Sequence, residues 1–267
     1  MPRFAANIST MYGEFKFLER FAAAVSGGFT AVEYQFPYAF DRRDAAAAAR
    51  EYRLPVILHN TPPGEFDKGE RGLGSIPGRQ AEFRDQLALA IDYARAVDCK
   101  KIHVMAGLWP AGAAEEELTK VFVENLRFAG KEAAKVGIDI LIEPLNRTSV
   151  PNYFLVKSKQ AIRIMDEAKV PNLFLQYDLF HMQIMEGNLA PTVERHLKRI
   201  GHIQIADTPG RREPGTGEIN FPFMLGHIDR VGYEGWIGAE YNSATDTNAT
   251  LGWFQPYRGA AILQRVS

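Results

Sequence analysis

The stretch Gly201-His-Ile-Gln-Ile-Ala-Asp-Thr-Pro-Gly-Arg-Arg-Glu-Pro-Gly-Thr-Gly-Glu-Ile-Asn-Phe221 decides which fold the chain is predicted to adopt. Its first part predicts a short buried strand over residues 202–205, because apolar Ile203 and Ile205 alternate with polar side chains. A loop rich in Gly, Pro and Thr follows, and it carries two arginines and two glutamates. Polar loops directly after buried strands are where α/β proteins place their active sites. We therefore expect a parallel α/β fold with a functional loop here.

The rest of the chain repeats this alternation of apolar runs and helical patterns. The runs that predict strands cover residues 4–8, 31–36, 55–60, 102–106, 140–144, 173–178, 202–205 and 236–241. The stretches with helical spacing cover residues 14–26, 43–52, 80–97, 114–136, 158–168, 191–198, 221–231 and 251–266. Such strand–helix units without a linker predict a closed (β/α)8 barrel, and we expect one domain over residues 1–267. A doubly wound open sheet is the alternative, but the first strand leads to no G-x-G-x-x-G turn.

Composition limits the partners that we expect. A net charge of −1 supplies no bulk attraction to nucleic acid or to an anionic membrane, and no apolar run approaches the ~20 residues of a membrane span. The first residues lack the apolar run of a signal peptide. The one cysteine, Cys99, excludes an internal disulfide and is expected to be a small packed residue. We therefore expect a cytoplasmic protein that acts on a small molecule.

Polar side chains end four of the late strands, at Glu143, Asp178, Gln204 and Glu240. The spacing between neighbours is each time about one strand–helix unit. Because the carboxyl ends of barrel strands share one face, these side chains are expected to meet on one rim. Three carboxylates and an amide oxygen suit a hard divalent ion, Mg2+ or Mn2+. Without a cation, clustered carboxylates would repel one another and some would stay protonated.

Six motifs are spread over nearly the whole chain. They are PRFAAN at 2–7, VMAG at 104–107, D-x-x-H at 178–181, QIADTPGRREPGTGEINF at 204–221, WIGAEY at 236–241 and GWF at 252–254. Together they resemble the hydroxypyruvate isomerase family of the xylose-isomerase-like barrels. The resemblance implies that Glu143, Asp178, Gln204 and Glu240 bind one divalent metal and that Glu143 and Glu240 also transfer protons.

The activity implied by the resemblance is a metal-assisted isomerisation. It interconverts hydroxypyruvate and 2-hydroxy-3-oxopropanoate through an enediolate, whose negative charge a bound metal stabilises. Related ketose 3-epimerases usually carry a histidine where this chain has Gln204. This departure favours the branch that acts on small hydroxy-oxo acids.

Four more residues are expected to bind the substrate. Arg211, on the loop after strand 202–205, is the candidate partner of the substrate carboxylate, because a guanidinium can bind an acid bidentately. His181 is expected to hold a substrate oxygen. His59 and Asn60, which end strand 55–60, are expected to line the pocket, with loop 61–78 as its wall or lid. His103, by contrast, is expected to be a packed residue.

Several other activities stay open at this point. A 2-oxo-tetronate isomerase would differ only in the depth of its pocket, and a ketose 3-epimerase would use similar proton chemistry. The same superfamily fold also serves DNA repair at abasic sites, which calls for a richer His/Asp metal cluster and a positive groove. A non-catalytic sugar- or acid-binding barrel would leave the α-proton of its ligand unexchanged. The aromatic segment 253–257 either covers the barrel or faces a partner subunit, so a homo-oligomer is also open.

Overall fold

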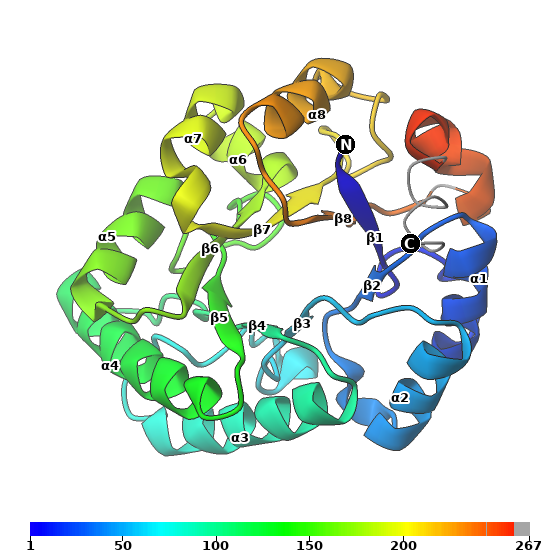
Figure 1. The fold of residues 1–267 in the computed structure, drawn as a ribbon. Coiled ribbons are helices and arrows are strands. Elements are labelled where there is room, and N and C mark those ends of the chain that lie inside the picture. Colours follow the sequence, from blue (N-terminus) through cyan, green and yellow to red (C-terminus); the bar gives the residue numbers. More distant parts are fainter. Residues whose placement is uncertain (244, 259–267) are drawn as a thin grey trace.

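A computed structural model describes residues 1–243 and 245–258 of the chain. Within these residues, eight parallel strands form one sheet in the order β2-β1-β8-β7-β6-β5-β4-β3. The strands are β1 Arg3–Asn7, β2 Val32–Glu33, β3 His59–Asn60, β4 Lys101–His103, β5 Asp139–Ile142, β6 Leu173–Asp178, β7 Ile200–Ile205 and β8 Trp236–Ala239. The first strand pairs with the last, so the sheet curls into a ring (Figure 1).

Backbone hydrogen bonds between the two ends of the sheet close this ring. The N–H of Ile57 donates to the carbonyl oxygen of Val32 at 2.8 Å. The N–H of Asn60 donates to the carbonyl oxygen of Gln35 at 3.0 Å. Residues 55–60 therefore run beside β2, although regular pairing with β4 is confined to β3. The prediction of a (β/α)8 barrel is confirmed.

Helices surround the ring of strands on its outer side (Figure 1). They are α1 Arg20–Ser26, α2 Arg42–Glu51, α3 Gln80–Ala96, α4 Glu115–Ala134, α5 Ser158–Ala168, α6 Leu179–Met185, α7 Leu189–His196 and α8 Phe221–Arg230. Helix α5 shows why they lie there, because Ala161, Ile164, Met165 and Ala168 form one buried stripe. Burial of a side chain such as Ile164 contributes about 1.5–3 kcal/mol.

Two of the predicted helices differ from the structure. The pattern predicts one helix at 191–198, between the strands at 173–178 and 202–205. The structure has α7 at that place and a further helix, α6, before it. Helix α6 begins directly after β6, because the Asp178 carboxylate caps it by accepting a hydrogen bond from the N–H of Phe180 at 2.8 Å. The last predicted helix, 251–266, is instead a 3-10 segment at Thr247–Tyr257. Its part beyond residue 258 lies outside the described residues.

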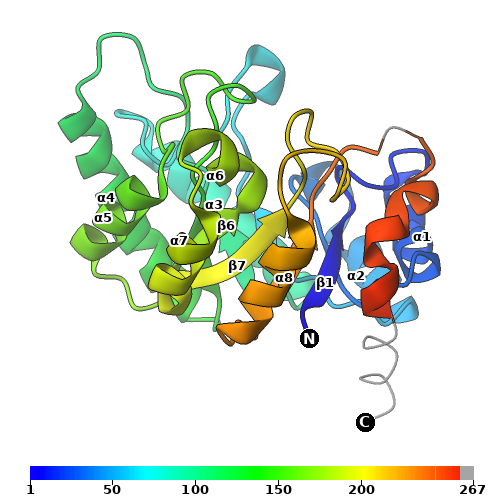
Figure 2. The same ribbon diagram turned by 90° about the horizontal axis from the view of Figure 1, so that it is seen from above.

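The two ends of the barrel differ in their loops. Long loops leave the carboxyl ends of the strands on one side, and the N-terminus lies on the opposite side (Figure 2). The loop over residues 61–79, which joins β3 to α3, contains a single 3-10 turn at Phe66–Lys68. The loop over residues 206–220 joins β7 to α8.

Asp207 fixes the loop that follows β7. Its carboxylate is fully buried and accepts hydrogen bonds from four backbone N–H groups of the loop at 2.8–3.1 Å. The donors are those of Thr208, Gly215, Gly217 and Ile219. A Cβ atom at Gly217 would lie 2.2 Å from the carbonyl oxygen of Thr208, so this close approach requires glycine. The loop is therefore held as one unit on the end of β7.

Candidate active site

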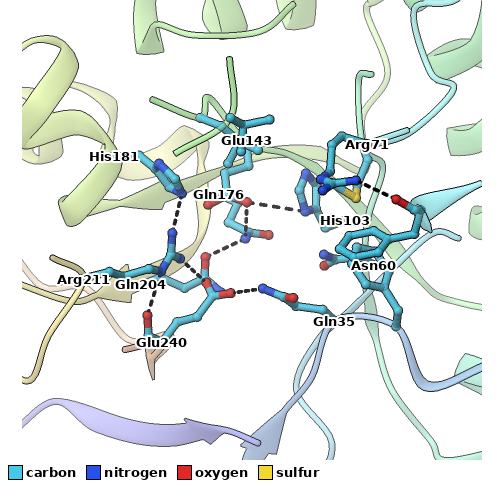
Figure 3. Close-up of a pocket in the computed structure, with 15 residues that line it drawn as sticks. Gln35, Asn60, Arg71, His103, Glu143, Gln176, His181, Gln204, Arg211 and Glu240 are labelled. Atoms are coloured by element: carbon cyan, nitrogen blue, oxygen red, sulfur yellow. Dashed lines mark hydrogen bonds and ion pairs between the residues drawn. The ribbon is translucent and has the colours of Figure 1, made fainter. Parts of the chain in front are cut away.

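A pocket of about 180 Å3 opens at the carboxyl ends of the strands (Figure 3). Six of the predicted site residues line it: Asn60, Glu143, His181, Gln204, Arg211 and Glu240. Asp178 lies beneath them and is buried. The loop over residues 61–79 contributes Phe66 and Arg71 to the opposite wall. The pocket is therefore bounded by polar side chains from most of the barrel.

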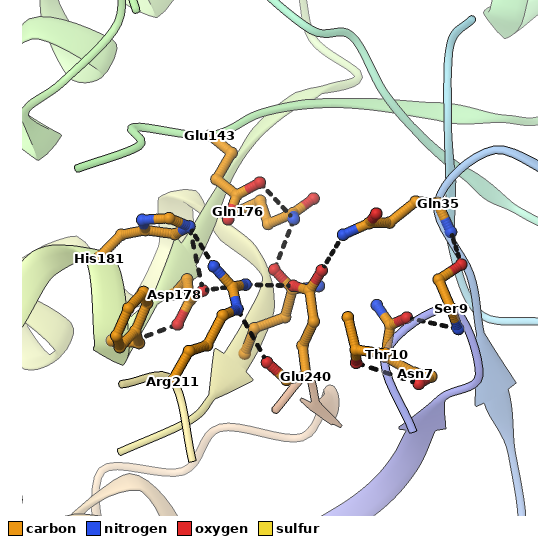
Figure 4. Close-up of polar contacts among 12 residues, drawn as sticks. Asn7, Ser9, Thr10, Gln35, Glu143, Gln176, Asp178, His181, Arg211 and Glu240 are labelled. Atoms are coloured by element: carbon orange, nitrogen blue, oxygen red, sulfur yellow. Dashed lines mark hydrogen bonds and ion pairs between the residues drawn. The ribbon is translucent and has the colours of Figure 1, made fainter. Parts of the chain in front are cut away.

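The structure brings the four strand-end residues together at this mouth: Figure 4 labels Glu143, Asp178 and Glu240, and Figure 3 labels Gln204. Glu143 directly follows β5 and Glu240 directly follows β8, whereas Asp178 and Gln204 lie opposite each other on paired strands. All four are buried. Gln176 of β6 links two of them, because its amide N–H group donates to Oε2 of Glu143 at 2.9 Å and to Oε1 of Gln204 at 2.6 Å.

Arg211 enters this cluster from the loop after β7. Its Nη2 lies 3.1 Å from Oδ2 of Asp178 and 3.0 Å from Oε2 of Glu240. Its Nε donates to the carbonyl oxygen of Glu240 at 3.1 Å, and its Nη1 lies 2.8 Å from Nε2 of His181. The three guanidinium nitrogens are all engaged, and two carboxylates share the positive charge.

Burial sets the electrostatics of the cluster. It raises the pKa of the Glu143 carboxyl well above its usual range, and the nearby Glu240 and Asp178 carboxylates raise that pKa further. Burial also raises the pKa of Glu240 to about 7, although the Arg211 guanidinium opposes the shift. The pKa of Asp178 is raised by burial against the same guanidinium. The cluster therefore contains three carboxyl groups but only one guanidinium, that of Arg211, to balance their negative charge.

A layer of polar residues inside the barrel orients Gln204 from below. The Gln204 amide N–H group donates to Oε1 of Glu33 at 2.7 Å, so its Oε1 faces the cluster. The Glu33 carboxylate also accepts from Asn7 at 3.1 Å and lies 2.6 Å from Nε2 of His202. A Cβ atom at Gly238 would lie 2.3 Å from both carboxylate oxygens of Glu33. A glycine in β8 therefore makes room for this buried acid.

His181 projects from helix α6 toward the cluster. Its Nδ1 accepts a hydrogen bond from the backbone N–H of Asn146 at 3.0 Å, and its Nε2 faces Arg211. Both neighbours are donors, whereas a neutral imidazole has one acceptor nitrogen, so the ring satisfies only one of them. Burial and the Arg211 charge lower the pKa of His181 well below its usual value, so the ring is neutral.

The strand register explains which residues of β3 and β4 face the pocket. Asn60 pairs with His103, and His59 pairs with Ile102. Side chains alternate along a strand, so Asn60 and His103 point into the pocket while His59 points away. The His59 ring packs 5.7–6.3 Å from the rings of Tyr34, Tyr38 and Tyr93, where burial lowers its pKa to about 4. His59 is therefore a packed residue and lies outside the pocket lining.

Sequence reasoning missed four polar residues of the pocket lining: Gln35, Arg71, His103 and Gln176. His103 was expected to be packed, because strand 102–106 placed it early in its strand, but β4 ends at this residue. Its Nδ1 lies 3.5 Å from Oε2 of Glu143, and burial lowers its pKa to about 3. Gln176 lies two residues before Asp178 and so points to the same side of β6. That alternation is the signal that could have identified it.

The chemistry of the cluster fits a divalent cation. Ligand atoms of Glu143, Asp178 and His181 lie within 4.8 Å of one another, and all three residues are buried. Oε1 of Glu143 has no hydrogen-bond partner among residues 1–243 and 245–258, although it is buried. A buried carboxylate oxygen of this kind needs a partner, and a metal ion can serve as one. These residues could therefore hold a metal.

Comparison with known proteins identifies the family. A model of the xylose isomerase-like TIM barrels matches residues 21–257, so the chain belongs to this family. Hydroxypyruvate isomerase of Escherichia coli (strain K12) is 45% identical, over 97% of this chain and 100% of that protein. The 2-oxo-tetronate isomerase of Cupriavidus necator is 46% identical, with the same coverage of the two chains. Among these barrels, the two relatives place the chain in the hydroxypyruvate isomerase family, which confirms the resemblance of its motifs.

Solved structures agree with the fold. One titled AP endonuclease, family 2, from Brucella melitensis is 43% identical, covers 97% of this chain and 100% of its own, and has a TM-score of 0.94. One titled L-ribulose 3-epimerase has a TM-score of 0.80 over 99% of this chain and 95% of its own. At 20% identity, that second likeness concerns the fold alone.

These comparisons confirm that the chain is an enzyme of the isomerase class. Both curated relatives bear isomerase names and are matched over their full length. Within the part of the chain that the structure describes, no helix combines the length and the apolar character that a membrane span requires. Cys99 is buried, in agreement with its predicted packing role.

Proposed function

We propose that the chain is a metal-assisted isomerase that interconverts hydroxypyruvate and 2-hydroxy-3-oxopropanoate. The observation that carries this proposal is the buried cluster of Glu143, Asp178, Gln204 and Glu240 at the barrel mouth. A relative named hydroxypyruvate isomerase, matched over its full length, supports the choice of substrate. The pocket volume of about 180 Å3 supports a small substrate. Pockets for drug-sized ligands span about 300–1,000 Å3.

The proposed ligands of one Mg2+ or Mn2+ ion are these four side chains. Each of them offers oxygen, which hard divalent ions prefer. The hydrogen bond from Gln204 to Glu33 supports this assignment, because it turns the amide oxygen toward the cluster. When bound, the ion would stabilise the negative charge that develops on the substrate oxygens. His181 also lies close enough to the acids to bind a metal, but it is proposed to bind a substrate oxygen instead, because Asn146 donates to its Nδ1 and leaves Nε2 to carry the proton.

Glu143 and Glu240 are proposed to move the proton. One carboxylate removes a proton from C3 of hydroxypyruvate, and the electron pair left behind becomes the C2–C3 double bond of the enediolate. As this enediolate forms, the π electron pair of the C2 carbonyl moves onto the C2 oxygen. A proton is then delivered to C2, the proton of the C3 hydroxyl passes to the C2 oxygen, and the C3 carbonyl forms. A carboxyl whose pKa is near 7, such as that of Glu240, can both accept and return a proton at neutral pH.

A 2-oxo-tetronate isomerase is the second candidate, because the relative from Cupriavidus necator bears that name at 46% identity. The same residues would act, and the extra carbon would extend toward the opposite wall of the pocket. DNA repair at abasic sites is less well supported, although one solved structure is titled AP endonuclease. The net charge of −1 supplies no bulk attraction to a DNA backbone. Failure to bind an abasic duplex at low salt would agree with the isomerase proposal.

Proton NMR in D2O tests the proposal directly. Hydroxypyruvate is incubated with the protein and Mg2+, with Mn2+ as a second metal in a parallel enzymatic assay. The expected result is the aldehyde isomer with deuterium incorporated at carbon, and loss of both signals on addition of EDTA. If hydroxypyruvate gives no product and no exchange, it is excluded as the substrate. The 2-oxo-tetronates and ketoses would then be compared in the same tube.

A further inference from the structure

We propose that Arg71, on the loop over residues 61–79, binds the carboxylate of the acid substrate and makes the pocket selective for acids over neutral sugars. This inference rests on the proposed isomerase function. It assigns to Arg71 the binding of the substrate carboxylate, the role that the sequence predicted for Arg211. Three observations support it: the contacts of the two arginines, the position of Arg71, and the charge of the pocket around each of them.

Arg211 has little capacity left for a substrate carboxylate. Its Nη2 contacts Asp178 and Glu240, its Nε donates to a backbone carbonyl, and its Nη1 faces His181. An acid placed beside it would also lie beside two carboxylates, and like charges in a buried site repel strongly. The positive charge of Arg211 is therefore already paired with the carboxylates of Asp178 and Glu240.

Arg71 is differently placed. Its Nη1 donates to the backbone carbonyl oxygens of Phe66, at 3.2 Å, and Glu70, at 2.6 Å. Its Nε and Nη2 make no hydrogen bond or ion pair to any residue in the ranges 1–243 and 245–258. Nε and Nη2 form one edge of the guanidinium, the edge that binds a carboxylate through two parallel hydrogen bonds. Arg71 thus offers an unshared charge and a bidentate edge.

The Arg71 side chain is held in the pocket wall. Its guanidinium carbon lies 3.9 Å from the centroid of the Phe66 ring, a cation–π contact that fixes the plane of the group. The backbone beside it is anchored to the end of β4, because the N–H of Gly74 donates to the carbonyl oxygen of Met105 at 3.1 Å. A Cβ atom at Gly72 would lie 2.6 Å from that same oxygen. The loop therefore presents Arg71 from a constrained backbone.

Arg71 and the acidic cluster face each other across the pocket (Figure 3). A small acid whose carboxylate meets Arg71 directs its C2 and C3 atoms toward Glu143 and Glu240. A neutral ketose of the same length has a carbinol in place of the carboxylate and gains no ion pair. Discrimination by charge at this wall would thus select hydroxy-oxo acids.

The test compares hydroxypyruvate with dihydroxyacetone, which carries CH2OH in place of the carboxylate. The variants are Arg71→Met, Arg71→Lys and the control Arg84→Met. Arg84 suits the control, because it also stacks on a phenylalanine, Phe128 at 4.9 Å, but lies outside the pocket lining. For Arg71→Met, kcat/KM on hydroxypyruvate should fall about 10–100-fold, mostly through KM, because a hydrogen-bonded charge is lost. Exchange of the dihydroxyacetone protons should change less than about 3-fold, within the usual context dependence of a single substitution.

Arg71→Lys should recover only part of the loss, because an ammonium cannot form the two parallel hydrogen bonds. It also keeps the test decisive if Arg71→Met fails to fold. Equal loss on both compounds, or no loss on hydroxypyruvate, would overturn the proposal. A binding arm separates this result from failure of the isomerase function. Unreactive glycerate should bind wild type and Arg84→Met in calorimetry but bind Arg71→Met weakly, and equal binding to all three would reject the role of Arg71 whatever the turnover.

Discussion

The two halves of the barrel mouth carry different chemistry. The half built from β5 to β8 contributes the three carboxylates and Gln204, together with Arg211 from its loop. The half built from β2 to β4 contributes neutral Asn60, His103 and Gln35 to the pocket lining, and Arg71 from its loop. One half could thus hold a cation, whereas the other offers neutral partners and an arginine that forms no ion pair within residues 1–243 and 245–258.

Burial favours the neutral form of titratable groups in both halves, so it shifts the pKa values of carboxyls and imidazoles in opposite directions. In the carboxylate half it raises the pKa values of Glu143, Asp178 and Glu240, which favours their protonated forms. It lowers the pKa of His181 in the same half. In the other half it lowers the pKa of His103 to about 3, so the imidazole stays neutral throughout the physiological range. One physical cause, desolvation, therefore favours protonated carboxyls in one half and neutral imidazoles in both.

The largest expected effect comes from removing a carboxylate. Glu143→Gln and Glu240→Gln should each lower kcat on hydroxypyruvate by about 1,000-fold, because general acid–base groups contribute about 10²–10⁴-fold. Each amide is close in size to the carboxylate it replaces, so circular dichroism and thermal unfolding should show an intact fold. Asn60→Asp adds a carboxylate in the other half of the mouth. Combined with Glu143→Gln or Glu240→Gln, it should not restore activity. Full activity in one of them would remove that residue from the proton transfer.

The second effect concerns pH in the metal-free protein. The folded-state pKa of Glu240, about 7, lies above its usual value of 4.5, so the folded state binds the proton more tightly. The associated stability is present below pH 4.5 and is lost as pH rises through about 7, by on the order of 3 kcal/mol. Urea unfolding of wild type and Glu240→Gln at pH 5 and pH 7.5, both in EDTA, measures it. Wild type should lose more stability over this range, and parallel curves would contradict the shift.

The third effect is stabilisation by metal. Mn2+ at about 100 times its Kd should raise the free energy of unfolding by about 2.7 kcal/mol, because it binds the folded state. For a chain of this size that corresponds to a rise in Tm of roughly 5–10 °C. Glu143→Gln should lose most of the rise, whereas His103→Gln, a change in the neutral half, should keep it. An equal rise in both variants would place the metal outside the cluster.

The smallest of these effects tests the layer below the site. Glu33→Gln can leave the Gln204 amide without its acceptor, so either end of the amide can face the cluster. Mn2+ affinity measured by calorimetry should fall about 10-fold, the low end for residues that orient a metal ligand. Arg84→Met, remote from the barrel interior, serves as the control. Unchanged affinity in Glu33→Gln would show that Gln204 needs no partner to present its oxygen.

Much of the barrel could be predicted from the chain because its signals are local. The strand over residues 173–178 and the helix over residues 158–168 have the same bounds in the structure, since an apolar run and an apolar stripe depend only on neighbouring residues. Helix α6 was missed because its apolar residues continue from β6 without a break. Its start depends on the Asp178 cap, a residue that the sequence argument had reserved for the site.

The candidate site divides in the same way. Glu143, Asp178 and Glu240 could be located because each ends a strand or directly follows one, and the barrel brings strand ends to one rim. His59 was expected in the pocket and His103 was not. The structure reverses both, because the bounds of β3 and β4 and their register decide which side chains face inward.

The sequence by itself determined the barrel, the set of oxygen-bearing residues at its mouth and the long loops around them, because these follow from hydrophobic period and order along the chain. Only the tertiary structure decided how each polar atom is used. Glu33 of β2 and Gln204 of β7 are hydrogen-bonded although they lie far apart in the chain, and Arg211 reaches the carboxylates of Asp178 and Glu240. Arg71 became a candidate only when its free edge and its place across the pocket were known. Direction and partnership of side chains depend on contacts between distant segments, which no local pattern contains.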